Sequence, residues 1–453
     1  MDSRALQRLI ARYVATDPPD SRRMFYTYEP LRYVRLDVAP PSFRKTLAGF
    51  LRRSQVPLAL YVHVPYCPRR CLYCTCNATA CSDRARVREV ARLLLRELDL
   101  LAPTLAPAGA AGRIDTIHLG GGSPTILADG EFDRLAERLR ALAAPHGPRE
   151  FAVEVDPRAV DTSRLRRYHE RGVNRLSVGV QDFEPRVLAA VGRTQARAAV
   201  EAVFSPEVRS LYPSIGMDLI CGLPRQTVRT WARTLEHVLR LRPDRVAVNP
   251  LNVVPGQAAA TILRRRGPLP GPAARVAMER LTVDTLVGGG YVRTGFDHFA
   301  LPHDDLARAV RTRTLHRNLL GYTPGVWHDV VGVGPGANTE LGPFRVKNEP
   351  LGPWSAALRG GRLPDHHGLL LSRDDLLRAD VIHELLAWYR VDVPGLERRH
   401  GVRFREALAA ELRALAGFAA DGLVRLRGEE LVVTARGRPF VLPICWAFAR
   451  ASG

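Results

Sequence analysis

Four cysteines stand within ten residues early in the chain, inside the stretch YVHVPYCPRRCLYCTCN. Only seven cysteines occur among 453 residues, so this density indicates a local function. Cys67, Cys71 and Cys74 are spaced C-x3-C-x2-C, and Cys76 follows them. A zinc ribbon uses two C-x2-C pairs with a long spacer, and the second pair is missing here. Three thiolates on one loop can instead hold three irons of a [4Fe–4S] cluster, because soft ligands suit such clusters, and leave one iron open.

The other cysteines and the N-terminus bear on where the protein works. Cys81, Cys221 and Cys445 are scattered, and we interpret them as packing residues. The first 23 residues carry charges throughout and no cleavage site of small residues, which argues against a secretory signal. No apolar run approaches the roughly 18 residues of a membrane helix. We therefore expect a cytoplasmic protein with no membrane partner, in which clustered thiols serve metal or redox chemistry.

The chain is strongly basic, with a formal net charge of +20 and a pI of about 10.5. Nearly all of its cations are arginine, with lysine only at Lys45 and Lys347, as a compositionally biased genome would give. No block of basic residues and no known nucleic-acid motif is present, so we expect no nucleic-acid partner. A small-molecule substrate with several carboxylates would suit this charge.

The elements that must position the cysteines are short β-rich runs alternating with helical stretches. Repeated βα units of this kind predict a parallel sheet curved into a barrel, and six units reach about residue 255. The predicted strands cover residues 60–65, 114–121, 149–155, 175–181, 215–220 and 244–251.

We expect four segments along the chain. They are an N-terminal extension (1–56), a partial barrel (57–265), a post-barrel segment that completes the active site (266–360) and a mostly helical C-terminal domain (361–453). Within the last segment, FREALAAELRALAGFAADGLVRLRGEELVVTARG predicts helix, strand, turn and strand, which is a winged-helix-like order.

Polar residues and glycines gather at the ends of the predicted strands. In barrels of parallel strands the chemistry occurs at the C-terminal strand ends, so these residues are expected to surround one mouth. A triple glycine also lets the backbone approach a ligand closely. The residues concerned are Gly120, Gly121, Gly122, Glu154, Gln181 and Asp218.

The cysteine spacing is the signature of the radical SAM superfamily, and the chain resembles the oxygen-independent coproporphyrinogen III oxidases within it. The similarity runs from about residue 57 to the C-terminus, in the same order and at similar intervals. It includes the extra Cys76. Beyond the cysteine loop, the motifs that carry it are IHLGGGSPT, VEVDPR, NRLSVGVQDF, MDLICGLPRQT, GFDHFA, LHRN, GYT, DGLVRL and TARGR. The resemblance implies an α/β fold with a partial (β/α)6 radical SAM barrel and a winged-helix-like C-terminal domain.

The resemblance also implies roles for single residues. Cys67, Cys71 and Cys74 correspond to ligands of the [4Fe–4S] cluster. Cys76 matches a cysteine that the family requires for activity but that need not touch iron. Tyr61 matches a position close to the cluster and SAM, and a strand aromatic that packs in the core is an equally good interpretation. The residues that match contacts of S-adenosylmethionine (SAM), with one or two SAM molecules bound, are Gly120, Gly121, Gly122, Glu154, Gln181, Arg193 and Asp218. For Glu154 and Asp218, the alternative to a SAM contact is a structural salt bridge at the barrel rim.

The family chemistry follows from the cluster. An external electron donor reduces it, SAM is cleaved to a 5′-deoxyadenosyl radical, and that radical takes hydrogen from a propionate side chain of the porphyrinogen. The propionate then loses carbon dioxide and an electron and becomes a vinyl group. The resemblance further implies a monomer.

Three motifs depart from the family pattern in segments expected near the substrate. RRMFYTYEP (22–30) replaces a segment like PRYTSYP, Leu319-Leu320 replaces Phe-Gln, and GVGPGA (332–337) replaces GMG-x-SA. Two alternatives therefore stay open. One is a class C radical SAM methyltransferase or cyclopropanase that uses two SAM molecules on a heteroaromatic natural product. The other is a haem chaperone or haem-degrading relative, although Cys76 counts against the chaperone.

The post-barrel histidines receive a structural interpretation. His298 and His316 match family motifs, but a lone histidine is more often a hydrogen-bonded structural group than a catalyst. His366 and His367 are expected in a loop.

Overall fold

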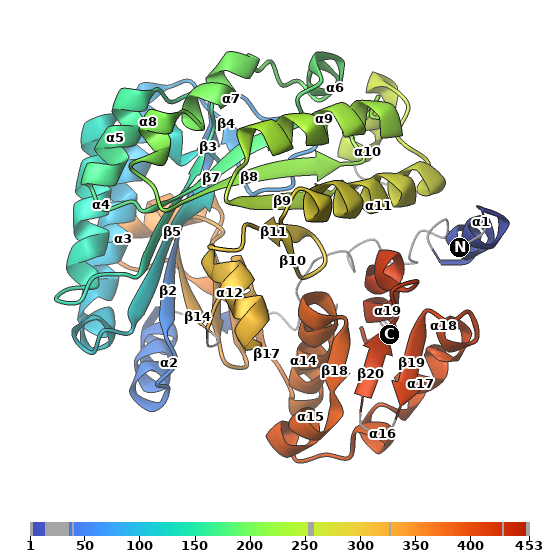
Figure 1. Ribbon diagram of the computed structural model, residues 1–453. Coiled ribbons are helices and arrows are strands. Elements are labelled where there is room, and N and C mark those ends of the chain that lie inside the picture. Colours follow the sequence, from blue (N-terminus) through green and yellow to red (C-terminus); the bar gives the residue numbers. More distant parts are fainter. Residues whose placement is uncertain are drawn as a thin grey trace.

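The structure is a computed structural model that describes residues 3–13, 36–38, 40–251, 258–325, 328–427 and 430–449. Its main feature is a sheet of 13 strands that curves around the centre of the molecule (Figure 1). Smaller sheets of two, three and two strands complete the described part of the chain.

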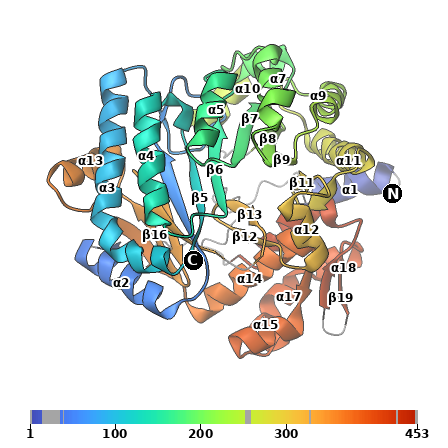
Figure 2. The same cartoon turned by 60° about the vertical axis from the view of Figure 1, so that its left-hand side comes forward.

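Six consecutive strands of the large sheet are parallel and confirm the predicted βα units. They are β2 (Leu58–Val64), β5 (Ile114–Gly121), β6 (Glu150–Val155), β7 (Arg175–Gln181), β8 (Ser214–Cys221) and β9 (Arg245–Pro250). Helices cover their outer face, as Figures 1 and 2 show. These helices are α3 (Arg84–Ala110), α4 (Asp129–Leu142), α5 (Thr162–Glu170), α6 (Pro185–Ala190), α7 (Arg197–Val203), α8 (Pro206–Arg209) and α9 (Val228–Leu241).

The pattern of apolar residues explains which face of the barrel is covered. In β7, buried and partly exposed residues alternate strictly, with Leu176, Val178 and Val180 fully buried. Side chains alternate across a strand, so this face packs against helices and the opposite face lines the barrel interior. Phe132 of α4 stacks on Tyr168 of α5 with ring centroids 3.9 Å apart. Burial of each such side chain contributes about 1.5–3 kcal/mol.

Four strands from later in the chain, and one from before β2, extend the barrel sheet beyond β2. β14 pairs with β2 in parallel, and the following strands are antiparallel. These strands are β14 (Asp329–Val333), β15 (Asn338–Leu341), β16 (Phe344–Asn348), β17 (His366–Leu370) and β1 (Leu36–Val38). The expectation of a loop at His366 and His367 is wrong, because both pair with β16.

The other edge of the sheet also gains strands, and helices connect these parts. β11 (His298–Ala300) pairs with β9, and β10 (Val292–Thr294) pairs with β11. β12 (His316–Asn318) and β13 (Gly321–Thr323) form a separate hairpin. The connecting elements are α2 (Pro40–Arg53), η2 (Pro124–Ile126), α10 (Ala258–Arg266), α11 (Pro272–Gly288), α12 (Asp305–Thr312) and α13 (Leu351–Arg359).

The C-terminal part has its own apolar core. The predicted order of a helical stretch and two strands is confirmed, but the single helix is divided into three short ones and a third strand joins the sheet. The predicted turn lies outside the described residues. Its elements are α14 (Arg373–Trp388), β18 (Arg390–Asp392), α15 (Val393–His400), α16 (Phe404–Ala407), α17 (Ala409–Ala414), α18 (Ala416–Ala420), β19 (Val424–Arg427), β20 (Glu430–Val433), η3 (Arg438–Phe440) and α19 (Val441–Trp446).

The N-terminal helix α1 (Ser3–Tyr13) packs on this C-terminal part. Leu9 and Ile10 belong to its core, and Tyr13 stacks on Phe418 with ring centroids 4.2 Å apart. The motif at 22–30, which differs from the family pattern, lies outside the described residues. The four segment boundaries stay predictions. In the described part of the chain, no helix is long and apolar enough to cross a membrane.

Candidate active site

The cysteine loop is anchored at both ends to the mouth of the barrel. β3 (Tyr66–Cys67) pairs with β4 (Thr79–Ala80), so residues 68–78 form a closed loop between them. Cys81 N donates to Cys67 O at 2.8 Å. Leu72 N donates to Val191 O at 3.0 Å, which ties the loop to the residue after α6. The backbone of the loop is therefore fixed by contacts that do not involve its thiols.

The three predicted ligand thiols share this loop. Cys71 is buried, whereas Cys67 and Cys74 are partly exposed. Burial and the neighbouring thiols raise the pKa of Cys67 to about 12, so cluster assembly must displace its proton. Within the described residues, no three His, Cys, Asp or Glu side chains form a site for one metal ion. A cubane binds each thiolate through a different iron, so thiols spread along one loop fit a cluster rather than a single ion.

The far end of the loop contacts the post-barrel strands. Cys76 is exposed, and the neighbouring Cys74 raises the pKa of its thiol well above the ordinary value. Asn77 O lies 2.8 Å from Nε2 of His63, and Asn77 Nδ2 donates to Pro335 O at 3.4 Å. Pro335 belongs to the divergent GVGPGA motif, whose first two residues end β14 and whose last four form the turn before β15. One of the family departures therefore lies directly against the cysteine loop.

The glycine run at the end of β5 brings backbone close to two side chains. A Cβ at Gly120 would be 2.4 Å from Oε1 of Glu154. Gly121 has a φ of 99°, and a Cβ there would be 2.4 Å from Nδ1 of His63. Gly121 requires glycine, because its φ is also strained for other residues. A side chain at Gly120 would force the Glu154 carboxylate to move. The result is a strip of bare backbone beside Glu154, as a cofactor contact needs.

Gly122 joins this strip to the cysteine loop. Its N–H donates to Val64 O at 2.7 Å, and a Cβ there would be 2.5 Å from Tyr66 O. Ser123 N donates to Tyr66 O at 2.8 Å. The glycine run and the start of the cysteine loop therefore form one hydrogen-bonded unit.

A row of polar side chains crosses β2, β5 and β6 on the inner face of the barrel. Glu154 Oε1 lies 3.1 Å from Nε2 of His118. Tyr61 pairs with His118 in the strand register, and its hydroxyl lies 2.9 Å from Nδ1 of His63. Burial raises the pKa of Tyr61 well above its ordinary value, and the charge of Glu154 adds to this. Tyr61 therefore remains a neutral hydroxyl that contacts His63, and its role at the cofactor site stays a prediction.

The row continues on β7 and β8. Ser177 Oγ donates to Oδ2 of Asp218 at 2.8 Å. Burial raises the pKa of Asp218, although the Ser177 hydrogen bond acts in the opposite direction. Gln181 has a φ of 73°, which is rare for a residue with a side chain and occurs where β7 and β8 shift register. Its Nε2 lies 3.0 Å from the position that a Cβ of Gly179 would occupy. Strained backbone at a strand end is typical of functional sites.

Arg193 connects the cysteine loop to the barrel. Its Nη1 lies 3.8 Å from Sγ of Cys71, and its Nη2 lies 3.4 Å from Oδ1 of Asp156. Nε and Nη2 donate to Oε1 of Gln195 at 2.9 and 2.7 Å, and Nη2 also donates to Gly179 O. The guanidinium is 5% exposed, so its charge acts at close range on the thiol.

The post-barrel motifs form a second cluster. His298 Nδ1 lies 2.7 Å from Oδ1 of Asp297, and Arg317 Nη1 donates to the same oxygen at 3.3 Å. Tyr322 OH donates to Leu386 O at 2.8 Å, which fastens this cluster to α14. Leu319 and Leu320 form the turn between β12 and β13. These contacts support the structural interpretation of His298.

The structure brings several unpredicted residues into the site. His63 and His118 lie two positions from Tyr61 and Gly120, so strict alternation along β2 and β5 could have identified them. Asp156, which contacts Arg193, directly follows the predicted strand 149–155, so its place at a strand end could have identified it. Gln195, which also contacts Arg193, lies on no strand and carries no comparable signal.

Comparisons with known proteins agree with this site. Residues 61–238 match the sequence model of the Radical SAM superfamily. The oxygen-independent coproporphyrinogen III oxidase of Pseudomonas aeruginosa is 35% identical over 404 residues, which cover 88% of this chain and 87% of that protein. The protein of the same name from Escherichia coli is 34% identical over 416 residues, which cover 91% and 89%.

A solved structure extends the similarity to the fold. Coproporphyrinogen III oxidase (HemN) from Escherichia coli, described as a radical SAM enzyme, has a TM-score of 0.84 and 32% sequence identity. The match covers 94% of this chain and 97% of that chain. It therefore includes the cysteine loop, the barrel and the post-barrel strands together.

Proposed function

The chain belongs to the oxygen-independent coproporphyrinogen III oxidase family of radical SAM enzymes, and from this premise we propose that it converts propionate side chains of coproporphyrinogen III to vinyl groups. Each conversion removes one hydrogen atom, one electron and one molecule of carbon dioxide from the substrate. An external electron donor and an electron acceptor complete the reaction. We further propose that the enzyme works as a monomer in the cytoplasm.

One observation carries the proposal: the thiol loop and the glycine run form a single hydrogen-bonded unit at the barrel mouth. Gly122 bonds to Val64, and Ser123 bonds to Tyr66, one residue before Cys67. An iron held on that loop and a ligand lying on that glycine strip are therefore placed side by side. A buried packing cluster of cysteines would need neither the glycines nor the polar row beside them.

The family uses a [4Fe–4S] cluster and SAM, and the residues present fit both. When bound and reduced, these cofactors supply a 5′-deoxyadenosyl radical that removes hydrogen from the substrate. We assign Cys67, Cys71 and Cys74 as the thiolate ligands. Cys76 lies two residues from Cys74, and we assign it a role in the reaction without iron ligation.

The remaining residues hold and orient the cofactor. The bare backbone of the glycine run can accept or donate hydrogen bonds to the amino acid part of SAM. Glu154 is partly exposed toward this strip, so its carboxylate can hold an ammonium or ribose hydroxyls. Asp218 and Gln181 offer polar groups on the neighbouring strands. Arg193 stabilises negative charge at Cys71, because its guanidinium is desolvated and close to that sulfur.

Product analysis tests the function directly. The full-length protein is reconstituted anaerobically with iron and sulfide and supplied with dithionite, SAM and coproporphyrinogen III. We expect vinyl-bearing porphyrinogen and one carbon dioxide for each vinyl group. S-adenosylhomocysteine without vinyl products would assign methyl transfer instead. Tight haem binding without SAM cleavage would assign the haem-handling alternative.

A further inference from the structure

A cavity lies outside the barrel, between α11 and the C-terminal part of the chain. Its volume is about 640 Å³, within the range of about 300–1,000 Å³ typical of small-molecule sites. It is lined by the ends of β8 and β9, by α11 and by α19, and Figure 1 shows α11 facing α19. Cys221 lines it, whereas Asp218 of the same strand does not. Residues an odd number apart on a strand point to opposite faces, so this cavity is separate from the barrel mouth.

The charge of the cavity is mainly positive. Among the described residues, four arginines and two carboxyl groups line it. Arg293 pairs with Glu279 at 3.4 Å, and Asp297 is held by Arg317 and His298 from behind. The other three arginines have no carboxylate partner among the residues that the structure describes. They are Arg264, Arg275 and Arg438.

The walls between these arginines are apolar and aromatic. Phe296 and Phe299 come from the β10–β11 hairpin, and Trp446 comes from α19. Arg438 also lies over the ring of Tyr389 at 5.1 Å, which holds its guanidinium near the cavity. The cavity thus combines an apolar interior with unpaired guanidinium groups, which bind carboxylates through two parallel hydrogen bonds.

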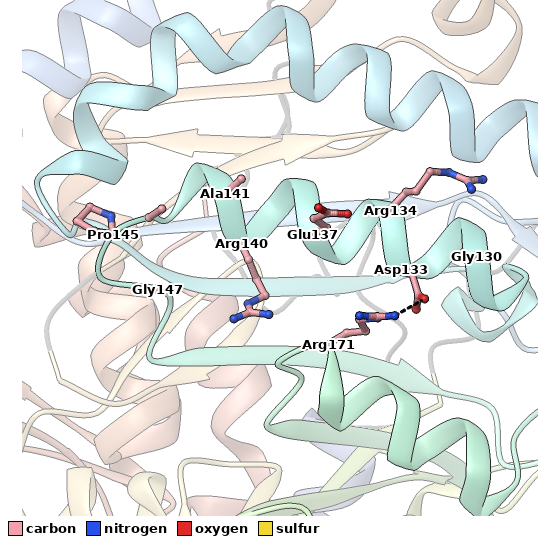
Figure 3. Close-up of a pocket in the computed structure, with 10 residues that line it drawn as sticks. Gly130, Asp133, Arg134, Glu137, Arg140, Ala141, Pro145, Gly147 and Arg171 are labelled. Atoms are coloured by element: carbon pink, nitrogen blue, oxygen red, sulfur yellow. Dashed lines mark hydrogen bonds and ion pairs between the residues drawn. The ribbon is translucent and has the colours of Figure 1, made fainter.

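A hollow on the outer face of α4 provides a contrast (Figure 3). It is similar in size, about 740 Å³, but no aromatic residue lines it. Its Arg171 is paired with Asp133 at 2.8 Å, the contact dashed in Figure 3. Arg134 and Arg140 of this hollow also have no carboxylate partner among the described residues. The feature that distinguishes the α11–α19 cavity is therefore the aromatic and apolar wall beside its arginines.

We propose that the α11–α19 cavity binds an amphipathic anion with a bulky apolar body and at least two carboxylates. The carboxylates pair with Arg264, Arg275 and Arg438, and the apolar body packs on Phe296, Phe299 and Trp446. A carboxylated tetrapyrrole and a long-chain dicarboxylic acid share this chemistry. The choice of a tetrapyrrole as the ligand rests on the proposed function. The more general choice of an amphipathic polycarboxylate does not.

Equilibrium binding to the reconstituted full-length enzyme tests the site with two probes. Coproporphyrin III is followed by its fluorescence and hexadecanedioic acid by calorimetry. We expect at least one probe to bind with an affinity that falls about 10-fold or more in the double variant Arg264→Ala/Arg275→Ala. Arg280→Ala is the matched control, because Arg280 is an exposed arginine on α11 outside the lining, and it should bind as wild type.

A second variant fills the cavity without changing its charge, so that a loss of binding does not depend on electrostatics alone. Gly271 lies at the cavity edge with an ordinary φ of −65° and open space around it, so Gly271→Trp adds bulk without strain. It should weaken the same probe. The tighter probe identifies the ligand source. Equal affinity in wild type and both cavity variants, or no binding of either probe, would overturn the proposal.

Turnover of coproporphyrinogen III by the same variants separates this site from the proposed function. The cavity variants should retain wild-type turnover, since they leave the barrel mouth intact. If wild type shows no turnover but binding still depends on Arg264 and Arg275, the proposed function fails and the cavity site stands.

Discussion

The barrel mouth and the α11–α19 cavity differ in the balance of their charges. At the mouth, Arg193 faces Asp156, and Glu154 lies beside His118. In the cavity, Arg264 and Arg275 have no acidic partner within the described chain. A mouth with balanced charge suits a cofactor that carries both an ammonium and a carboxylate, whereas excess guanidinium suits an anion. The comparison separates a place built for cofactor chemistry from one built for binding.

The largest expected effect comes from removing one thiol at the mouth. Cys71→Ala should abolish cluster assembly and lower turnover more than about 1,000-fold, because the cluster would lose one of its three protein ligands. Iron and sulfide analysis with visible absorption measures the loss. Cys445→Ala is the control, since Cys445 is buried in the C-terminal core and should keep its iron at a stability cost of about 1 kcal/mol. Equal iron content in Cys71→Ala and Cys445→Ala would contradict the assignment of Cys71 as a cluster ligand.

The glycine strip should be the next most sensitive feature. In Gly120→Ala the new Cβ would meet Oε1 of Glu154 at 2.4 Å, so the carboxylate must move. We expect SAM cleavage to fall about 100-fold while the cluster still assembles, because displaced contacts near the reacting atoms are costly. Gly288→Ala on α11 meets no atom within 4 Å and should be as active as wild type. Unchanged SAM cleavage in Gly120→Ala would show that no ligand depends on this strip.

Glu97 tests the junction between the barrel and the added strands. It lies on α3 and accepts hydrogen bonds from Gly334 N, Trp354 Nε1 and Asn348 Nδ2. Full burial raises its pKa to about 7 from 4.5. The folded state thus holds the proton more tightly, so the free energy of unfolding should fall as pH rises from about 4.5 to 7, by on the order of 2 kcal/mol.

Glu97→Gln should remove this part of the pH dependence, as denaturant unfolding at pH 5, 6, 7 and 8 would show. Glu170→Gln provides the exposed control, because Glu170 ends α5 at the surface and its substitution should leave the curve unchanged. If the free energy of unfolding depends on pH in the same way in wild type and Glu97→Gln, the buried carboxyl is not the source of that dependence.

The smallest expected effect concerns the guanidinium at the mouth. Arg193→Gln removes the contacts to Cys71 and Asp156 and should lower turnover about 10-fold, since a charged hydrogen bond contributes about 1.5–3 kcal/mol. The cluster should still assemble, and its reduction potential should become more negative because a nearby positive charge is lost. Arg186→Gln, an exposed arginine on α6, controls for general charge effects. An unchanged potential would show that Arg193 has only a structural role.

The sequence predicted the barrel side far better than the added strands. Ile114–Gly121 and Arg175–Gln181 were expected at these bounds, because alternating or continuous apolar runs are local signals. The pairing of Asp329–Val333 with β2 was not expected, since it joins residues far apart in the chain. For the same reason the contact of Pro335 with Asn77 could not be foreseen. Arg264, Arg275 and Arg438 of the cavity come from α10, α11 and η3, so only the folded chain brings them together.

Deuterium transfer from the substrate tests the central claim most directly. Coproporphyrinogen III deuterated at the β-carbons of its propionates is incubated anaerobically with the reconstituted enzyme, a reductant and SAM, and the 5′-deoxyadenosine is examined by mass spectrometry. We predict one deuterium in each 5′-deoxyadenosine, formed together with a vinyl-bearing product. Unlabelled 5′-deoxyadenosine without vinyl product would contradict hydrogen abstraction from a propionate at this barrel mouth.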